Sequence, residues 1–292
     1  MKTTLTRIHT KDGIELVGLL YEPDSPSDTI LVHVHGMAGN FYENKFLDNI
    51  AQALTTNGIA FFAFNNRGCE FVKDLTKIEG TESKFVQIGN TYEVFEESAL
   101  DIEAAVGFAH EKGFESIHLS GHSLGTSKVA YYVTQPQAKT LASVIFLSPS
   151  DMVGLFQKDK NYQRDMAFSL QMATEGKSRE LTSHPGIWGE YQLSASTYIS
   201  LGSRDSKVAI FNFYNPEDSL TTLGKITVPT LAVMGRKDDA LVIPIEDTMA
   251  RLKKALAASA KIETNILGDA GHGYHTYEQA LAEVITTWIQ KI

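Results

Sequence analysis

A serine placed between two glycines at a predicted turn constrains the fold more than any other part of this sequence. A short apolar run over residues 116–120, as in a buried strand, leads into Gly121-His122-Ser123-Leu124-Gly125, and residues 126–133 then have the character of a helix. A serine at such a junction must adopt strained backbone geometry, and small residues two positions before and after it let strand and helix pass closely. The pattern predicts a nucleophile elbow, with the hydroxyl of Ser123 projecting above the edge of a sheet.

Continuous apolar runs alternate with amphipathic helical segments along most of the chain. The expected buried strands cover residues 29–34, 59–64, 116–120, 141–147, 230–235 and 261–267. The expected helices cover residues 43–57, 95–112, 126–133, 245–256 and 280–288. Two further strands, 4–10 and 14–21, alternate polar and apolar residues around a Lys-Asp-Gly turn and predict a hairpin. This alternation predicts an α/β fold whose mostly parallel sheet is covered by helices on both faces.

The alternation stops at about residue 150 and resumes after residue 222. The intervening segment has no strong strand pattern, but Tyr162, Met166, Leu170 and Ala173 recur at helical spacing. We therefore expect one α/β core made of residues 1–149 and 223–292, with residues 150–222 inserted as a mainly helical cap. Its aromatic and Met side chains are expected either to pack the helices or to line the mouth of a site. They are Met152, Phe156, Tyr162, Met166, Phe168, Met172, Trp188, Tyr191 and Tyr198.

A serine nucleophile needs a base, a carboxylate that orients the base, and donors for an oxyanion. After Ser123, the next suitable acids lie in Gly235-Arg236-Lys237-Asp238-Asp239, directly after a predicted strand. The loop after the following strand, residues 268–274, holds His272 with a glycine on each side. The carboxyl ends of parallel strands are where such sheets build their sites, so we expect these three segments to meet.

Two adjacent or nearby residues compete for the same roles. Asp239 is the alternative to Asp238 as the orienting carboxylate, since both follow the same strand. His275 is the alternative to His272 as the base, although it lacks the flanking glycines.

Taken together, these segments resemble the α/β-hydrolase superfamily, specifically an esterase-like serine hydrolase with a helical cap, over essentially the full chain. The resemblance rests on four segments in order: His35-Gly36, Gly121-His122-Ser123-Leu124-Gly125, the Gly-x-x-Asp of residues 235–238, and Gly271-His272-Gly273. There is no His-Gly-Gly-Gly run, which makes the lipase and esterase branch with that loop a poor match. A serine at the elbow also differs from the aspartate of the dehalogenase and epoxide-hydrolase branches.

The resemblance implies a role for each residue at the predicted site. Ser123 is implied as the nucleophile, His272 as the general base and acid, and Asp238 as the carboxylate that orients the histidine. The backbone N–H groups of Met37 and Leu124 are implied as the oxyanion hole. The resemblance implies no cofactor.

Several other residues invite a functional interpretation. His33 and His35 share a strand face and could suggest a metal site, but no acid or cysteine cluster has matching spacing, so we expect hydrogen-bonded core histidines and no metal. We expect His122 to line a pocket rather than to transfer a proton. We expect Cys69 to be structural or incidental. Arg67 lies where family members carry an arginine that ties loops beneath the active site, with a surface salt bridge as the alternative.

Bulk properties exclude several classes of partner. The chain of 292 residues carries a net charge of −9 with its acids scattered, whereas nucleic acid and anionic membranes require a basic face. No apolar run suggests a signal peptide or a membrane span, and a single cysteine excludes an internal disulfide. We expect a cytoplasmic protein with no nucleic-acid or membrane partner, and the oligomeric state stays open.

The expected activity is hydrolysis of a small or medium-sized carboxylic ester through an acyl-enzyme, with thioesters and lactones as further candidate substrates. An acyltransferase using the same three residues is one alternative. A non-catalytic binding module on the hydrolase fold is the other, but such a module would normally have lost one of the three residues.

Overall fold

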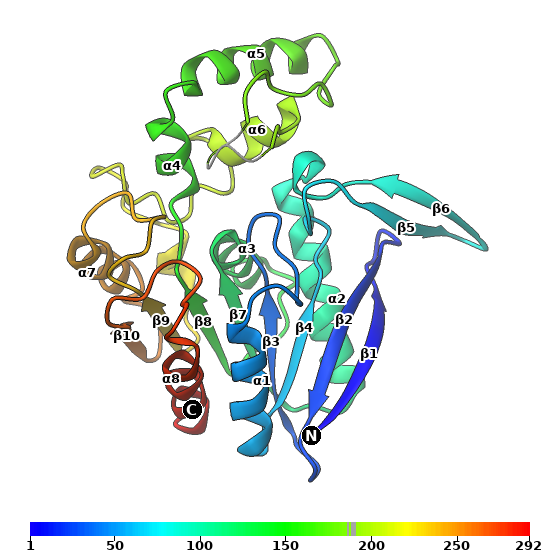
Figure 1. The fold of residues 1–292 in the computed structure, drawn as a ribbon, viewed down its shortest axis with the longest axis vertical. Helices are drawn as coiled ribbons and strands as arrows, with labels where there is room; N and C mark the ends of the chain where they lie inside the picture. Colours follow the sequence, from blue (N-terminus) through cyan, green and yellow to red (C-terminus); the bar gives the residue numbers. More distant parts are fainter. Residues whose placement is uncertain (186, 188–190) are drawn as a thin grey trace.

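An eight-stranded sheet forms the centre of the molecule, in the order β1-β2-β4-β3-β7-β8-β9-β10 (Figure 1). The structure is a computed structural model that describes residues 1–185, 187 and 191–292. The strands are β1 (Lys2–His9), β2 (Glu15–Glu22), β3 (Thr29–Val34), β4 (Ala60–Phe64), β7 (Ser116–His122), β8 (Ser143–Leu147), β9 (Thr230–Met234) and β10 (Ile262–Ile266). Strand β2 pairs antiparallel with β1 and β4, and all other neighbours are parallel. The predicted mostly parallel sheet and its N-terminal hairpin are confirmed.

Helices cover both faces of this sheet, which confirms the predicted α/β architecture. They are α1 (Phe46–Thr56), α2 (Ser98–Glu111), α3 (Leu124–Val133), α7 (Ile245–Ala255) and α8 (Glu278–Gln290), with short 3₁₀ helices at Asn90–Tyr92, Phe95–Glu97 and Leu223–Lys225. Apolar side chains of α2, α3 and α7 form one core with the sheet, and those of α1 and α8 form a second core on the opposite face.

Strand β3 shows why a doubly covered strand has a continuous apolar sequence. Successive side chains of a strand point to opposite faces. Ile30 and Val32 accordingly join the core under α2 and α3, while Leu31 joins the core under α1 and α8. The strand lies in the middle of the sheet, between β4 and β7. Because both of its faces are covered, its sequence does not alternate between polar and apolar residues.

Helices α4 (Met152–Lys158), α5 (Tyr162–Thr174) and α6 (Ala195–Gly202) fall between β8 and β9, within the segment predicted to be inserted. They lie beyond the carboxyl ends of the strands (Figure 1). The predicted helix around residue 166 is present as α5, but its apolar spacing does not mark a fully buried face. Its buried residues are Asp165 and Ser169, whereas Leu170 is 52% exposed.

Strands β5 (Asp74–Glu79) and β6 (Glu82–Gln87) form a separate two-stranded sheet that extends outward from the core (Figure 1). A bridge between Ile14 and Lys77 attaches it to the N-terminal hairpin. The sequence pattern did not predict this hairpin. Its residues are largely polar and exposed, so neither strand carries the buried apolar run by which the core strands were recognised.

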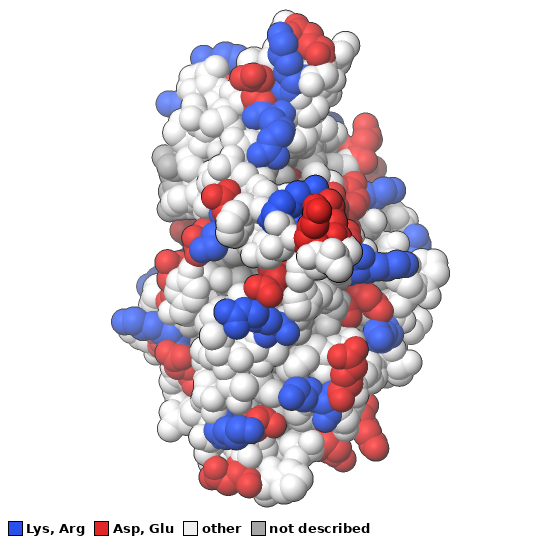
Figure 2. Space-filling view, turned by 90° about the vertical axis from the view of Figure 1, so that its right-hand side faces the viewer, with Lys and Arg blue, Asp and Glu red and all other residues white. Residues whose placement is uncertain are grey.

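Charged side chains of both signs are interspersed on the face of the molecule shown in Figure 2, with neutral areas between them. The described residues include no helix with the length and hydropathy needed to cross a lipid bilayer.

Candidate active site

Ser123 occupies the strained turn between β7 and α3 that the sequence predicts. Its backbone has φ = 56° and ψ = −127°, a left-handed conformation that non-glycine residues rarely adopt. A Cβ atom added to Gly121 would lie 2.3 Å from the carbonyl oxygen of Gly125, and one added to Gly125 would lie 2.3 Å from that of Val34. Both positions therefore require glycine, because the helix leaves the strand at van der Waals contact.

His272 forms a hydrogen bond with Asp238, whereas the two alternative residues are exposed. Nδ1 of His272 lies 2.8 Å from Oδ1 of Asp238, whose side chain is fully buried. Asp239 is exposed, and His275 is exposed at 81% of its side chain beside Glu278. Burial alone would raise the pKa of Asp238, but the hydrogen bond from His272 and its charge hold that pKa below its ordinary value. Asp238 is thus a carboxylate that fixes the histidine ring with its Nδ1 proton toward the acid.

Two residues hold the loop that carries His272. Nε2 of His122 donates a hydrogen bond of 2.9 Å to the carbonyl oxygen of His272, and burial lowers the pKa of His122 to about 3, so this ring is neutral. The hydroxyl of Tyr274 donates to the carbonyl of Val233 and accepts from Ser148, both at 2.9 Å. His122 also lines the pocket as predicted. Nothing in the sequence distinguished Tyr274 as a support for the loop.

Ser123 and His272 line the same pocket, which has a volume of about 400 Å³. Oγ of Ser123 lies 3.4 Å from Oγ of Ser150, and Ser150 in turn donates to the carbonyl of Ser148 at 3.1 Å. His272 thus forms a direct hydrogen bond with the carboxylate of Asp238, and it lines the same pocket as Ser123. Sequence reasoning missed Ser150, although its place just after a buried strand puts it at the same sheet edge.

Both predicted oxyanion-hole residues lie near Ser123: Met37 lines the same pocket, and Leu124 is the next residue in the chain. Met37 lines the pocket, and a Cβ atom on the preceding Gly36 would lie 2.8 Å from Cβ of Ser123, so this loop packs directly on the serine. Leu124 is the first residue of α3 and is fully buried. The first N–H groups of a helix have no partner within the helix and can donate to an anion in front of it.

The pocket walls carry negative charge. Its described lining includes the carboxylates of Glu43 and Asp239, the apolar side chains of Met37 and Phe71, and no lysine or arginine.

Ligating atoms of Asp238, Asp239 and His272 lie within 4.8 Å of one another. Among the described residues, this is the group whose spacing would suit a metal ion. The hydrogen bond between Asp238 and His272 already occupies two of these groups. His33 and His35 are buried and hydrogen-bonded, as predicted: Nδ1 of His33 lies 2.9 Å from Oγ of Ser120, and His35 contacts backbone groups.

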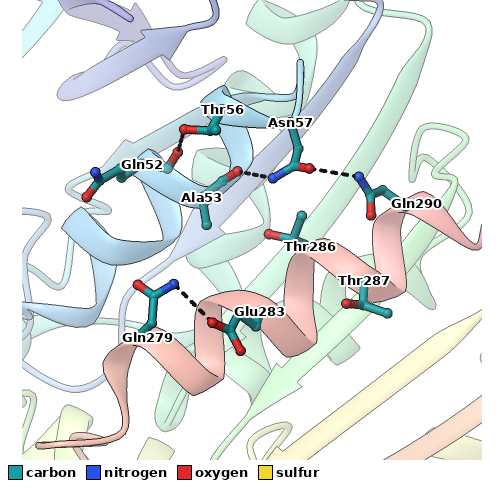
Figure 3. A pocket seen from close by; sticks show the side chains of 9 residues that line it. All are labelled: Gln52, Ala53, Thr56, Asn57, Gln279, Glu283, Thr286, Thr287 and Gln290. Carbon is teal, nitrogen blue, oxygen red and sulfur yellow. Dashed lines mark hydrogen bonds between the residues drawn. The ribbon is translucent and has the colours of Figure 1, made fainter.

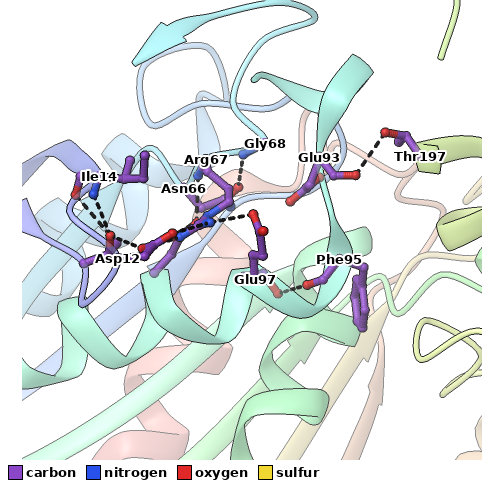
Figure 4. A network of polar contacts seen from close by, with 12 residues as sticks. Asp12, Ile14, Asn66, Arg67, Gly68, Glu93, Phe95, Glu97 and Thr197 are labelled. Atoms are coloured by element: carbon purple, nitrogen blue, oxygen red, sulfur yellow. Dashed lines mark hydrogen bonds and ion pairs between the residues drawn. The ribbon is translucent and has the colours of Figure 1, made fainter. Parts of the chain in front are cut away.

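Arg67 is a buried residue that ties loops together, and the alternative of a surface salt bridge is wrong (Figure 4). Its side chain is 1% exposed and pairs at 2.9 Å with Asp101, which is fully buried, as well as with Asp12 and Glu97. The burial follows from the position of Arg67 at the end of β4, between the N-terminal hairpin and the start of α2. Cys69, two residues on, is also buried, and burial raises its pKa to about 12, which disfavours the nucleophilic thiolate form.

Three of the aromatic side chains considered in the segment between β8 and β9 pack against other parts of that segment. The rings of Phe156 and Tyr198 meet edge to face at 5.0 Å, and the hydroxyl of Tyr162 donates to the carbonyl of Gly202. The ring of Tyr191 lies 4.0 Å from that of Phe71, which lines the pocket. Trp188 lies outside the described residues.

A second groove, of about 390 Å³, lies between α1 and α8, and its polar groups bond to one another (Figure 3). Asn57 donates to the carbonyl of Ala53 at 2.8 Å and accepts from Gln290 at 3.1 Å, and Gln279 donates to Glu283 at 3.2 Å. No predicted site residue lines it, so it offers no nucleophile and base of the kind found at the sheet edge.

A protein-family profile described as "Protein of unknown function (DUF1749)" matches residues 77–290, well over half of the chain. The chain belongs to this family. A comparison with curated proteins found no significant match.

Solved structures with a similar fold include named α/β-hydrolases and esterases. The α/β-hydrolase GrgF from Penicillium sp. sh18 has a TM-score of 0.70 at 15% identity, covering 100% of this chain and 99% of that one. The siderophore hydrolase EstB from Aspergillus fumigatus has a TM-score of 0.69 at 16% identity, covering 100% and 97%. Est1E from Butyrivibrio proteoclasticus has a TM-score of 0.62 at 18% identity, covering 98% of each chain. The protein therefore has the α/β-hydrolase fold.

Proposed function

We propose that the protein is a serine hydrolase that cleaves small or medium-sized carboxylic esters through an acyl-enzyme. One observation carries the proposal: Ser123, held in a strained turn, shares a pocket with His272, whose ring is fixed by the buried carboxylate of Asp238. That combination supplies a nucleophile, a base and an orienting group at one sheet edge. The names of similar structures, among them the siderophore hydrolase EstB and Est1E, which has been solved with ferulic acid bound, support ester cleavage.

The acylation half-reaction uses all three residues. Nδ1 of His272 keeps its proton and donates it in a hydrogen bond to Asp238, so Nε2 accepts the proton of Ser123 as Oγ attacks the ester carbonyl carbon. The negative charge then develops on the carbonyl oxygen, where the N–H groups of Met37 and Leu124 stabilise it. Losing one such donor typically costs about 3–4 kcal/mol of transition-state stabilisation. The imidazolium next protonates the leaving alcohol.

Deacylation repeats these steps with water in place of the serine. His272 removes a proton from water, the hydroxide attacks the acyl carbon, and Ser123 leaves with the proton that His272 returns. If a second alcohol or thiol took the place of water, the same residues would catalyse acyl transfer. Product analysis with an added acceptor separates the two reactions.

The charge of the pocket favours neutral or cationic esters. Because Glu43 and Asp239 line it, with no lysine or arginine among the described lining residues, a carboxylate on the substrate would meet like charge. Residues 150–222 form the proposed cap. Their helices lie beyond the carboxyl ends of the strands (Figure 1), and we propose that they set the size of the acyl or alcohol group that the pocket accepts.

A panel of p-nitrophenyl esters of increasing acyl length, with thioester, lactone and dicarboxylate half-ester members, tests this function. We expect hydrolysis of short or medium neutral esters and weaker hydrolysis of their half-ester counterparts. Ser123→Ala should reduce kcat by more than about a thousandfold, leaving the small rate that binding and the oxyanion hole provide. Wild-type protein inactive across the whole panel would contradict the proposal.

A further inference from the structure

His35 is buried beneath the loop that carries Met37, and its two ring nitrogens have different partners. The backbone N–H of Asn66 donates to Nε2 of His35 at 3.0 Å, and Nδ1 of His35 lies 2.9 Å from the carbonyl oxygen of Gly36. A backbone N–H can only donate, so Nε2 must be the acceptor and the ring proton must be on Nδ1. His35 therefore donates a hydrogen bond to the carbonyl of Gly36. Burial lowers the pKa of His35 to about 3, so this tautomer persists at neutral pH.

The carbonyl of Gly36 belongs to the same peptide group as the N–H of Met37. In a trans peptide these two groups point in opposite directions across a rigid plane. A hydrogen bond that fixes the carbonyl toward His35 therefore fixes the N–H on the opposite side. Met37 lines the pocket and Gly36 packs on Ser123, so that opposite side is the side of the site. The N–H of Gly39 also donates to this carbonyl, at 3.3 Å, and His35 provides the shorter of the two bonds.

A buried polar network holds His35 itself in place. The side-chain amide of Asn66 donates to the backbone carbonyl of His35 at 3.2 Å, and its Oδ1 accepts from Nζ of Lys128 at 3.1 Å. Lys128 is fully buried on α3, the helix that begins at the elbow, and pairs with Glu93, which is also fully buried. The backbone carbonyl of Glu93 accepts from Thr197 of α6 at 3.0 Å (Figure 4).

We propose that His35 is a positioning residue for the oxyanion hole, which fixes the Gly36–Met37 peptide so that the Met37 N–H faces Ser123. The Asn66–Lys128–Glu93 network anchors this histidine to α3 and to the cap. The inference rests on the proposed hydrolase function, and it assigns His35 no contact with the substrate.

Two substitutions at His35 each keep one of its two hydrogen bonds. Asn places an amide N–H₂ near the position of Nδ1 and keeps the donor to Gly36, while Gln places its amide oxygen near Nε2 and keeps the acceptor for Asn66. His35→Gln should lower kcat roughly tenfold to a hundredfold, less than the 10²–10³ expected for removing a donor outright, with KM within about twofold. His35→Asn should stay within about threefold of the wild type. The inhibition constant of a boronic acid, which forms a tetrahedral anion on the serine, should rise in His35→Gln in step with the fall in kcat/KM.

Equal falls in kcat in the two variants, or a raised KM with unchanged kcat, would overturn the inference. The proposed hydrolase function would still stand if the wild type showed an activity that depends on Ser123. If wild type shows no such activity, the inference falls together with the proposed function. Should either variant fail to fold, ¹⁵N–¹H correlation spectra of histidine-labelled wild type decide the matter. We expect the His35 ring to be neutral with its proton on Nδ1, and a proton on Nε2 would overturn the proposal.

Discussion

The α/β core and the helices between β8 and β9 differ in the polar groups that they bury. In the core, Asp238 forms a hydrogen bond with His272, and the buried Lys128–Glu93 pair is linked through Asn66 to the backbone of His35. In the inserted segment, helix α5 buries Asp165 and Ser169 and leaves Leu170 half exposed. The buried charges of the core thus hold residues of the candidate site, whereas the polar groups buried by α5 do not line that pocket.

The largest effect should come from the carboxylate of the core site. Asp238→Asn keeps the side-chain shape but favours the wrong tautomer of His272, so kcat should fall by up to about 10⁴-fold. The matched variant Asp239→Asn changes an exposed neighbour and should cost far less. Steady-state kinetics of both variants checks this, and a deeper loss at Asp239 would reverse the assignment.

Removing a buried charge from the core should cost more stability than removing an exposed charge from the segment between β8 and β9. Arg67→Met leaves the fully buried Asp101 without its charged partner, with only the backbone N–H of residue 67 still donating to it, and should lower the free energy of unfolding by about 3–5 kcal/mol. Arg204→Met removes an exposed cap arginine whose hydrogen bond goes to Gln157, and it should change that free energy by less than about 0.5 kcal/mol. Urea unfolding of the two variants compares them, and similar losses would remove the distinction.

The junction of core and cap should show its own pH dependence. Burial raises the pKa of Asp151, which caps α4, to about 6 from an ordinary value of 3.8. Between these values the unfolded chain loses this proton while the folded one keeps it, so the free energy of unfolding should fall by about 2 kcal/mol as pH rises from 4 to 6.

Asp151→Asn should lack this contribution, and the exposed control Asp205→Asn should retain it. The measurement is urea unfolding at pH 4 and pH 7 for all three proteins. Parallel pH profiles for wild type and Asp151→Asn would count against a raised pKa at this junction.

The smallest effect should be on substrate binding where the core pocket meets the cap. Phe71 lines the pocket and its ring contacts Tyr191, so Phe71→Ala should raise KM roughly three- to tenfold with kcat little changed. Phe85→Ala removes a ring that is 79% exposed on the β5–β6 hairpin and should leave both constants unchanged. Equal behaviour of the two variants would mean that Phe71 does not contact the substrate.

Sequence patterns predicted the parts of the fold in which local periodicity and burial agree. The strand Thr29–Val34 has its predicted bounds because both faces are buried and every position is constrained. The strained turn at Ser123 was predictable because only glycines fit at the contacts around it.

Features that depend on long-range contacts were not predictable in this way. The burial of Arg67 follows from acids at positions 12, 97 and 101, which no local pattern connects. The hydrogen bond from His122 to the carbonyl of His272 joins residues 150 positions apart. The β5–β6 hairpin lacks a buried face, and the apolar spacing of α5 predicted a helix without showing which of its sides is covered.

The proposed reaction requires Ser123 to form the covalent intermediate, and one measurement tests this directly. The enzyme is mixed with an activated ester, quenched in acid during turnover, digested, and its peptides are analysed by mass spectrometry. We predict one added acyl group on the peptide that contains Ser123, still present in Ser150→Ala and absent in Ser123→Ala. If the protein turns over the ester but the acyl group is found on another residue, the role of Ser123 as nucleophile is contradicted. The same holds if no acylated peptide is found although deacylation is rate-limiting.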